Sequence, residues 1–218
     1  MNKFTSRVNE ILASAAENKN REKNGILPAN TLLLRGAGSY HKVPTLDERF
    51  GLRSACIAGG ALYKGVATFV GMDIFMVPEA TGSKNTSLKA KALAVKKALS
   101  QGYTFVLLHI KATDSFSHDG DLKGKTAFIE KIDREIIPTL MKTGAYLIVT
   151  GDHSTPCSRK NHSAHEVPII IYGKDELKDK VSKFDELSCM DGGLGHIEGK
   201  DVMRLMLNLL EKSLKFGS

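Results

Sequence analysis

The sequence contains no tryptophan, few cysteines and no long hydrophobic run. Its three cysteines, Cys56, Cys157 and Cys189, form no CxxC pair. An odd number of scattered cysteines argues against a disulfide framework and for a reducing compartment. We expect each thiol to be a small buried or partly buried side chain. No apolar run approaches the roughly 18 residues of a membrane-spanning helix, and no apolar signal segment opens the chain. We therefore expect a cytoplasmic protein with no membrane partner.

The charge balance is basic but without a dense basic segment. The chain has 31 lysines and arginines against 24 acidic residues, which gives a formal net charge of +7. The basic residues are mixed with acidic ones, and aromatic residues make up only 6% of the chain. This pattern indicates an ordinary solvated surface, so we expect no nucleic-acid partner. The positive excess remains compatible with a small anionic substrate.

Short apolar runs alternate with segments of helical spacing from residue 31 onward. Apolar strands that alternate with helices are typical of a parallel sheet covered on both faces. We predict an α/β fold, a largely parallel sheet with helices on both faces. The expected strands are 31–35, 54–59, 73–78, 104–110, 145–150 and 167–173, and the expected helices are 60–70, 88–99, 123–143 with a kink at Pro138, and 199–214.

The N-terminal segment differs from the rest of the chain. Residues 3–18 have helical spacing, and a polar stretch then runs to Gly25 and is followed by Pro28. We expect residues 1–29 to form an appended helix and linker, and residues 30–218 to form the main α/β domain.

Two of the expected strands, 104–110 and 145–150, run directly into residue types that bind transition metals. The carboxyl ends of strands in open α/β sheets are where ligands bind. Mixed carboxylate and imidazole donors suit Mn²⁺, Zn²⁺ or Fe²⁺ better than Ca²⁺. The candidate ligands are Asp114, His118, Asp152, His153 and, ten residues further on, His162.

Each of these residues also has an ordinary structural interpretation. Asp114 alone is more readily interpreted as a helix N-cap, and a single histidine at a strand end is usually a surface residue. Ser154 and Thr155 read as caps of the turn that follows. The convergence of two Asp/His clusters at neighbouring strand ends is what favours a metal site. His165 suits a loop equally well, and we interpret the other three histidines as non-ligands: His41, His109 and His196.

Four long motifs make a family comparison specific. They read LPANTLLLRGAGSYHKVPTLDERFGLRSACIAGGALYKGVATFVGMD, LLHIKATDSFSHDGDLKGKTAFIEKID, GDHSTPCSRKNHSAHEVPIIIYG and GGLGHIEGKDVM. In this order they resemble the archaeal-type, cofactor-independent phosphoglycerate mutases of the alkaline phosphatase superfamily, over residues 25–210. The resemblance implies an alkaline-phosphatase-like core without its N-terminal part, in which residues 30–218 form the metal-binding domain.

The resemblance also implies roles for individual residues. Two divalent ions are expected, with Mn²⁺ preferred over Zn²⁺, Co²⁺ or Mg²⁺. Arg35 and Lys64 would hold the phosphate or carboxylate of phosphoglycerate. The family reaction interconverts 3-phosphoglycerate and 2-phosphoglycerate through a phosphoserine, as an isomerase of glycolysis and gluconeogenesis. The implied ligands of the first ion are Asp114, His118 and His162, and those of the second are Asp152 and His153.

Part of the family pattern is missing from this sequence. The family begins with a strand that ends in Asp-Gly and continues to the nucleophilic serine, and both would precede Met1. We therefore expect a chain that is inactive alone, with an open sheet edge that a separate N-terminal half or a second copy would cover. His196 stands where the family often has arginine, which weakens a phosphate-binding role for that loop. Two alternatives stay open: a stand-alone metal-dependent phosphoesterase, and a non-catalytic metal-binding remnant.

Overall fold

The computed structural model describes residues 2–34, 36, 38–174 and 176–213. By its internal contacts the chain divides into two compact units, residues 1–42 and 43–218. The separation of residues 1–29 from residues 30–218 stays a prediction. Within the described parts of the chain, every helix is too short or too polar to cross a membrane.

The first unit contains two helices, α1 (Asn2–Ser14) and α2 (Ala16–Lys23). They replace the single helix expected over residues 3–18, because the backbone at Ala15 is extended (φ −63°, ψ 134°). Asn18 is buried, and its side-chain amide donates to the carbonyl oxygens of Leu12 and Ala29, at 2.7 Å each. The amide nitrogen of Ala29 donates back to Asn18 Oδ1 at 2.9 Å, so this one side chain holds the helices and the following segment together.

The apolar run at 31–35 is not a strand where the structure describes it. Residues 31–34 carry no regular secondary structure, and Leu33 is 81% exposed. A strand is stable only beside a hydrogen-bonded neighbour, and none lies beside this run among the described residues of its unit. Arg35 lies outside the described residues.

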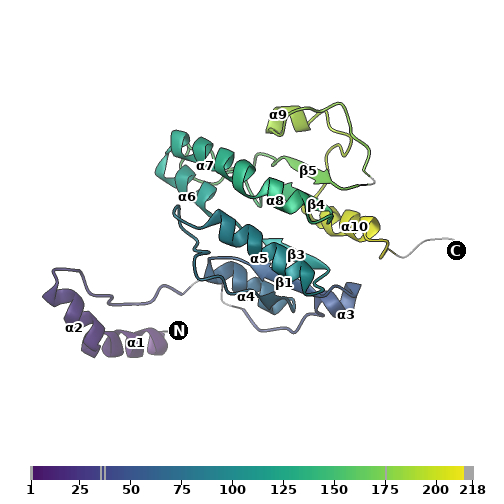
Figure 1. Ribbon diagram of the computed structural model, residues 1–218. Coiled ribbons are helices and arrows are strands. Elements are labelled where there is room, and N and C mark those ends of the chain that lie inside the picture. Colours follow the sequence, from purple (N-terminus) through teal and green to yellow (C-terminus); the bar gives the residue numbers. More distant parts are fainter. Residues whose placement is uncertain (1, 35, 37, 175, 214–218) are drawn as a thin grey trace. The chain divides into compact units, whose positions relative to one another are not determined.

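The second unit alternates strands and helices in the expected order (Figure 1). Pro138 lies in the first turn of a separate short helix instead of kinking a continuous one. The elements are α3 (Leu46–Phe50), β1 (Ser54–Ile57), α4 (Ala61–Phe69), β2 (Asp73–Ile74), α5 (Leu88–Ser100), β3 (Phe105–Leu108), α6 (Ala112–Asp119), α7 (Leu122–Glu135), α8 (Ile137–Met141), β4 (Leu147–Thr150), β5 (Ile169–Tyr172), α9 (Glu186–Cys189) and α10 (Gly199–Leu209).

The strands form a parallel group and an antiparallel pair. Strand β1 lies between β2 and β3, parallel to both, with Cys56 opposite Ile74 on one side and Leu107 on the other. Strands β4 and β5 pair in antiparallel register, with Val149 opposite Ile170. The predicted α/β class with a parallel sheet is therefore confirmed.

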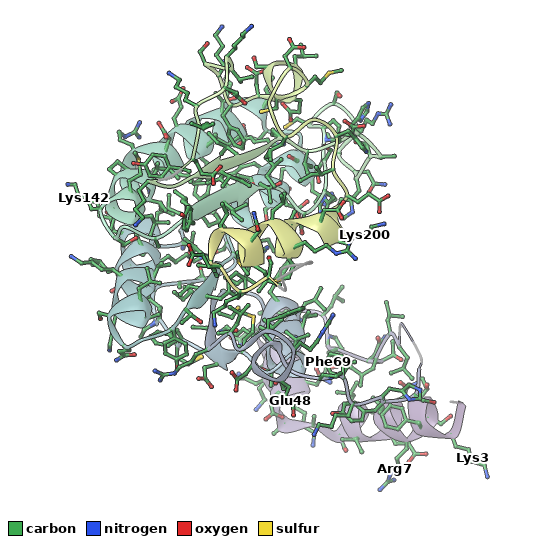
Figure 2. All side chains as sticks on the ribbon, turned by 90° about the vertical axis from the view of Figure 1, so that its right-hand side faces the viewer. Lys3, Arg7, Glu48, Phe69, Lys142 and Lys200 are labelled. Carbon is green, nitrogen blue, oxygen red and sulfur yellow. The ribbon has the colours of Figure 1, made fainter. Side chains whose placement is uncertain are left out.

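Helices cover both faces of these strands. Successive β1 residues point to opposite faces, so Ile57 enters a core built with α5, α7 and α8, while Cys56 enters a core built with α3, α4 and α10. Both side chains are fully buried, and burial raises the pKa of the Cys56 thiol. The cysteines in the structure are free thiols. Charged side chains such as Lys142 and Lys200 project from the surface of this unit (Figure 2).

Strands β3 and β4 each have one open edge. In the described part of the chain, β3 pairs only with β1, and β4 pairs only with β5. Yet β3 and β4 pack into the same two cores, since Val106 and Leu147 enter one and Phe105 and Ile148 enter the other. The expectation that 104–110 is buried on both faces is wrong, since Leu107 is 40% exposed. An edge strand has no neighbour to cover that side.

A lysine is enclosed beneath the end of β3. Lys91 on α5 has no exposed surface, and its ammonium donates to the carbonyl oxygen of His109 at 2.9 Å. Burial lowers the pKa of Lys91 from 10.5 to about 8, because the charged form loses its hydration. The pKa of His109 is also lowered, to about 4, chiefly because the ring is buried. The segment that follows β3 is therefore held by a buried ammonium group, whose desolvation lowers the stability of the folded chain.

We expect Lys91 to make the free energy of unfolding rise with pH between about pH 8 and pH 10.5. Between pH 8 and 10.5 the unfolded chain keeps the Lys91 proton that the folded chain releases, so the free energy of unfolding increases with pH. Lys91→Met should abolish this rise and stabilise the protein near pH 7 by about 1–3 kcal/mol, after the loss of the bond to His109. Urea unfolding at several pH values measures both effects. Lys96→Met, an exposed change on the same helix, serves as the control. Equal pH profiles for the wild type and Lys91→Met would contradict this account.

Candidate metal centre

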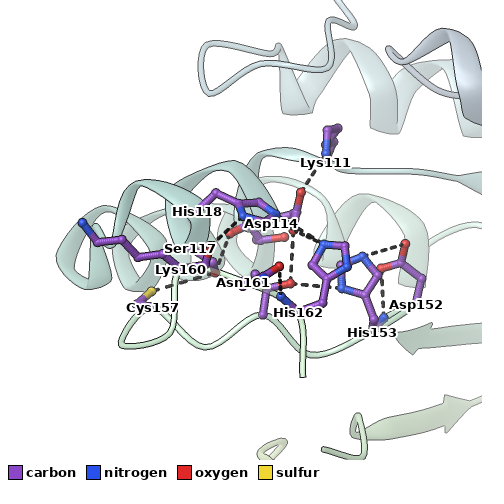
Figure 3. Close-up of polar contacts among 12 residues, drawn as sticks. Lys111, Asp114, Ser117, His118, Asp152, His153, Cys157, Lys160, Asn161 and His162 are labelled. Atoms are coloured by element: carbon purple, nitrogen blue, oxygen red, sulfur yellow. Dashed lines mark hydrogen bonds and ion pairs between the residues drawn. The ribbon is translucent and has the colours of Figure 1, made fainter. Parts of the chain in front are cut away.

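The candidate ligands come from the segments that follow β3 and β4 (Figure 3). After β3 the chain enters α6, where Asp114 and His118 lie one turn apart on the same side of the helix. After β4 come Asp152 and His153, and an antiparallel bridge between Ser154 and Ser163 brings His162 back toward them. The two Asp/His clusters therefore meet, as the strand-end argument expects.

Asp114, His118 and His162 form a compact triad. Each offers one ligand atom, and the three atoms lie within 4.8 Å of one another. His118 Nε2 is 3.2 Å from Asp114 Oδ1 and 3.3 Å from His162 Nε2, and His162 Nε2 is 3.6 Å from the same carboxylate oxygen. Asp114 is half-buried and the two rings are exposed, so an ion has access from solvent.

The hydrogen bond of His118 Nδ1 determines whether Nε2 faces the triad with a hydrogen or with a lone pair. His118 Nδ1 lies 2.9 Å from the backbone carbonyl oxygen of Lys160. A carbonyl oxygen can only accept, so Nδ1 carries the hydrogen and Nε2 of the neutral ring points a lone pair at Asp114. A backbone carbonyl that orients the far side of an imidazole is a common feature of metal-binding histidines. In the metal-free chain a hydrogen on His162 Nε2 can fill the space between these atoms, at 3.3 Å from His118 Nε2. A divalent ion in its place would meet two imidazole nitrogens and one carboxylate oxygen, so the residues fit such an ion.

Asp114 is held in its charged form. Lys111 donates to Asp114 Oδ2 at 2.7 Å, and the Thr155 hydroxyl donates to Oδ1 at 3.1 Å. Burial alone would favour the neutral acid. The hydrogen bond and positive charge of Lys111, with the bond from Thr155, outweigh it and lower the pKa of Asp114. The same bond to Asp114 raises the pKa of Lys111. The carboxylate is thus ionised at neutral pH, as a ligand must be.

Asp152 and His153 lie beside the triad. His153 Nε2 is 3.6 Å from Asp152 Oδ2, and the rings of His153 and His162 lie against each other at a tilt of 32°, with centroids 3.8 Å apart. Thr155 does not cap a turn, because its hydroxyl is engaged by Asp114 and by His153 Nδ1 at 3.0 Å. Ser154 is not a cap either, since its hydroxyl donates to the carbonyl oxygen of Glu166 at 3.2 Å.

The remaining candidate residues lie outside the triad. Lys64 on α4 is half-buried, with its ammonium 3.9 Å from the sulfur of Met76. His165 Nδ1 contacts the hydroxyl of Ser163 at 2.8 Å, and His196 pairs with Glu166. The substrate-binding roles of Lys64 and Arg35 stay predictions.

Sequence reasoning missed three groups that support the site. Lys111 precedes Asp114 by three residues, so helical spacing could have found it. Thr155 follows His153 by two residues in an irregular loop, where spacing predicts no contact. The carbonyl of Lys160 leaves no trace in the sequence, because every residue has one. His109, which we interpret as a non-ligand, stacks on Tyr63 with ring centroids 3.4 Å apart. Its buried Nδ1 has no hydrogen-bond partner among the described residues.

Known proteins resemble this chain over its whole length. The model of the metalloenzyme superfamily matches residues 8–209. A 2,3-bisphosphoglycerate-independent phosphoglycerate mutase of Archaeoglobus fulgidus is 46% identical over 222 residues, and one of Methanocaldococcus jannaschii is 40% identical over 221. Each alignment covers 100% of this chain and 54% of the relative.

Solved structures give the same result. The cofactor-independent phosphoglycerate mutase of Thermoplasma acidophilum matches 96% of this chain and 50% of its own, with a TM-score of 0.65 and 34% identity. A protein of Pyrococcus horikoshii matches 100% of this chain and 58% of its own, with a TM-score of 0.90 and 39% identity. The chain spans about half the length of the curated relatives it matches. The resemblance inferred from the motifs is confirmed, and the family together with the triad indicates use of a divalent metal.

We expect Asp114→Asn to weaken divalent-metal binding at least about 100-fold, because the only anionic ligand of the triad becomes neutral while its shape is kept. Calorimetric titration of the chain with Mn²⁺ and with Zn²⁺ measures the dissociation constant. Asp133→Asn, the same chemical change at an exposed position of α7, should leave the constant unchanged. Undiminished affinity in Asp114→Asn would remove this carboxylate from the site.

Proposed function

Because this chain belongs to the metalloenzyme superfamily, we propose that it is the metal-binding part of a phosphoglycerate mutase. This isomerase would interconvert 3-phosphoglycerate and 2-phosphoglycerate, as an enzyme of glycolysis and gluconeogenesis in the cytoplasm. The observation that carries the proposal is the convergence of Asp114, His118 and His162 on one point, in a chain whose curated relatives are named phosphoglycerate mutases.

Two divalent ions fit the proposed site, with Mn²⁺ as the first choice. Asp114, His118 and His162 would hold one ion, and Asp152 and His153 would hold part of the shell of the second. When bound, such ions supply positive charge that stabilises a transferring phosphoryl group and lowers the pKa of an attacking hydroxyl. The close contact of the His153 and His162 rings supports two neighbouring ions, since it places the two ligand sets side by side.

The basic side chains of the chain would bind the substrate. Lys64 on α4, with Arg35, would hold the phosphate or carboxylate of phosphoglycerate. Lysine and arginine bind such anions through charge-assisted hydrogen bonds. Lys111 has another task, because its ammonium is bonded to Asp114 and orients that carboxylate.

We propose that the nucleophilic serine, and a further metal-binding carboxylate, come from another segment. Three serines near the triad are engaged otherwise. Ser117 is fully buried and donates to the carbonyl oxygen of Thr113 at 3.1 Å. Ser154 donates to Glu166, and Ser163 contacts His165. These contacts support a phosphoserine formed on a residue outside the described part of this chain.

The open edges of β3 and β4 support a partner that supplies a strand. Both strands contribute side chains to the same two cores, so a strand inserted between them could bond to both edges and cover Leu107. A separate N-terminal half would provide that strand and the missing catalytic groups together. A second copy of the chain would cover the edge only.

We expect the purified chain with Mn²⁺ to show no turnover of 3-phosphoglycerate in an enolase-coupled assay. Turnover should appear when the N-terminal half of an archaeal relative is co-expressed with it, and Asp114→Asn in that complex should abolish the activity. Hydrolysis of a simple phosphate ester by the chain alone would instead favour a phosphoesterase. A stable complex with bound Mn²⁺ but no turnover would favour a non-catalytic protein.

Hydrogen–deuterium exchange tests the open edges separately from catalysis. Amide groups on an unpaired strand edge exchange faster than those of a central strand. We expect β3 and β4 to exchange faster than β1, the central strand of the same unit, which serves as the internal control. The added N-terminal half should then slow exchange in β3 and β4. Protection of all three strands in the lone chain would show that the edges are already covered.

A further inference from the structure

The hydroxyl of Thr155 lies between the two ligand clusters. Its oxygen is 3.1 Å from Asp114 Oδ1, in the triad, and 3.0 Å from His153 Nδ1, in the neighbouring pair. The residue is only 5% exposed, so water does not replace either contact. Its own backbone oxygen accepts a hydrogen bond from Lys125 of α7 at 3.1 Å, which anchors the backbone at this residue.

The single hydroxyl hydrogen of Thr155 determines the direction of both bonds. The carboxylate of Asp114 can only accept, so the hydroxyl donates to it. The oxygen then has only lone pairs left for His153, and Nδ1 of that ring must carry the hydrogen. In a neutral imidazole, the hydrogen bond made by one nitrogen sets the state of the other, so His153 Nε2 is left with a free lone pair.

We propose that Thr155 is a positioning residue that fixes the tautomer of His153 and thereby creates the second metal position. With Nε2 unprotonated, the lone pair of His153 faces Asp152 Oδ2 at 3.6 Å, so both groups can act as ligands of one cation. Without the hydroxyl, the ring hydrogen would move to Nε2 and be donated to Asp152. The pair would then satisfy itself and offer no site.

The hydroxyl affects the two metal positions unequally. Asp114 keeps its bond to Lys111 when the hydroxyl is removed, so the triad stays charged and oriented. His153 has no other partner for Nδ1 among the bonds described, so Thr155 is the group that holds the ring hydrogen on Nδ1 against the pull of Asp152 at Nε2. The inference rests on the proposed two-ion site, and it adds the residue that prepares the second position.

Thr155→Val removes the hydroxyl and keeps the shape, and Thr155→Ser keeps the hydroxyl. Long-range ¹H–¹⁵N correlation spectra of the metal-free, ¹⁵N-labelled chain at about pH 8, where an ordinary imidazole is neutral, report which ring nitrogen carries hydrogen. We expect the Nδ1–H form of His153 in the wild type and in Thr155→Ser, and the Nε2–H form in Thr155→Val. An Nε2–H form in the wild type overturns the proposal, whether or not the valine variant folds.

Calorimetric titration with Mn²⁺ gives the second readout. We expect the weaker of two binding events to be lost, or weakened about 10–100-fold, in Thr155→Val and kept in Thr155→Ser, while the tighter event changes less than tenfold in both. Equal weakening of both events in the two variants would reduce Thr155 to a structural role and overturn the proposal. Absence of any Mn²⁺ binding by the wild type would refute the proposed function, and the tautomer spectra would still decide the role of Thr155.

Discussion

The site depends on one constraint: hydrogen bonds from neighbouring groups turn the Nε2 lone pair of His118 and the charged carboxylate of Asp114 toward the same point, where a divalent ion can bind both. His118 cannot turn its hydrogen toward the triad, because Nδ1 is bonded to the carbonyl oxygen of Lys160. Asp114 cannot take up a proton readily, because Lys111 and Thr155 hold it charged against the effect of burial. The triad is therefore prepared for a divalent ion by groups that do not themselves bind it.

The fold serves this constraint by fixing the two segments that carry the ligands. Helix α6 sets the spacing of Asp114 and His118, and the Ser154–Ser163 bridge returns His162 to them. Beneath the end of β3, the buried ammonium of Lys91 holds the carbonyl of His109 at a cost in stability near neutral pH. The same region leaves β3 and β4 with open edges, so the site stands beside the part of the sheet that is incomplete in the described chain.

Sequence patterns predicted what depends on local spacing. The helix at 88–99, the strands after which the ligands come and the shared helical face of Asp114 and His118 all follow from short-range periodicity. Strand pairing did not follow. The apolar run 31–34 has no paired strand among the described residues of its unit, and Leu107 is apolar but lies on an edge strand. The bonds of Thr155 and of the Lys160 carbonyl depend on loop geometry, which residue types do not specify. The assignment of the individual ligands therefore remains a proposal built on geometry.

X-ray absorption spectroscopy of the chain loaded with one equivalent of Zn²⁺ tests the central claim most directly. The account predicts a shell with two imidazole nitrogens and at least one carboxylate oxygen, at about 2.0–2.2 Å, completed by water. The two imidazoles should produce the outer-shell scattering typical of rigid rings. A shell of oxygen atoms alone, without imidazole scattering, would contradict the claim that His118 and His162 present their lone pairs to the ion.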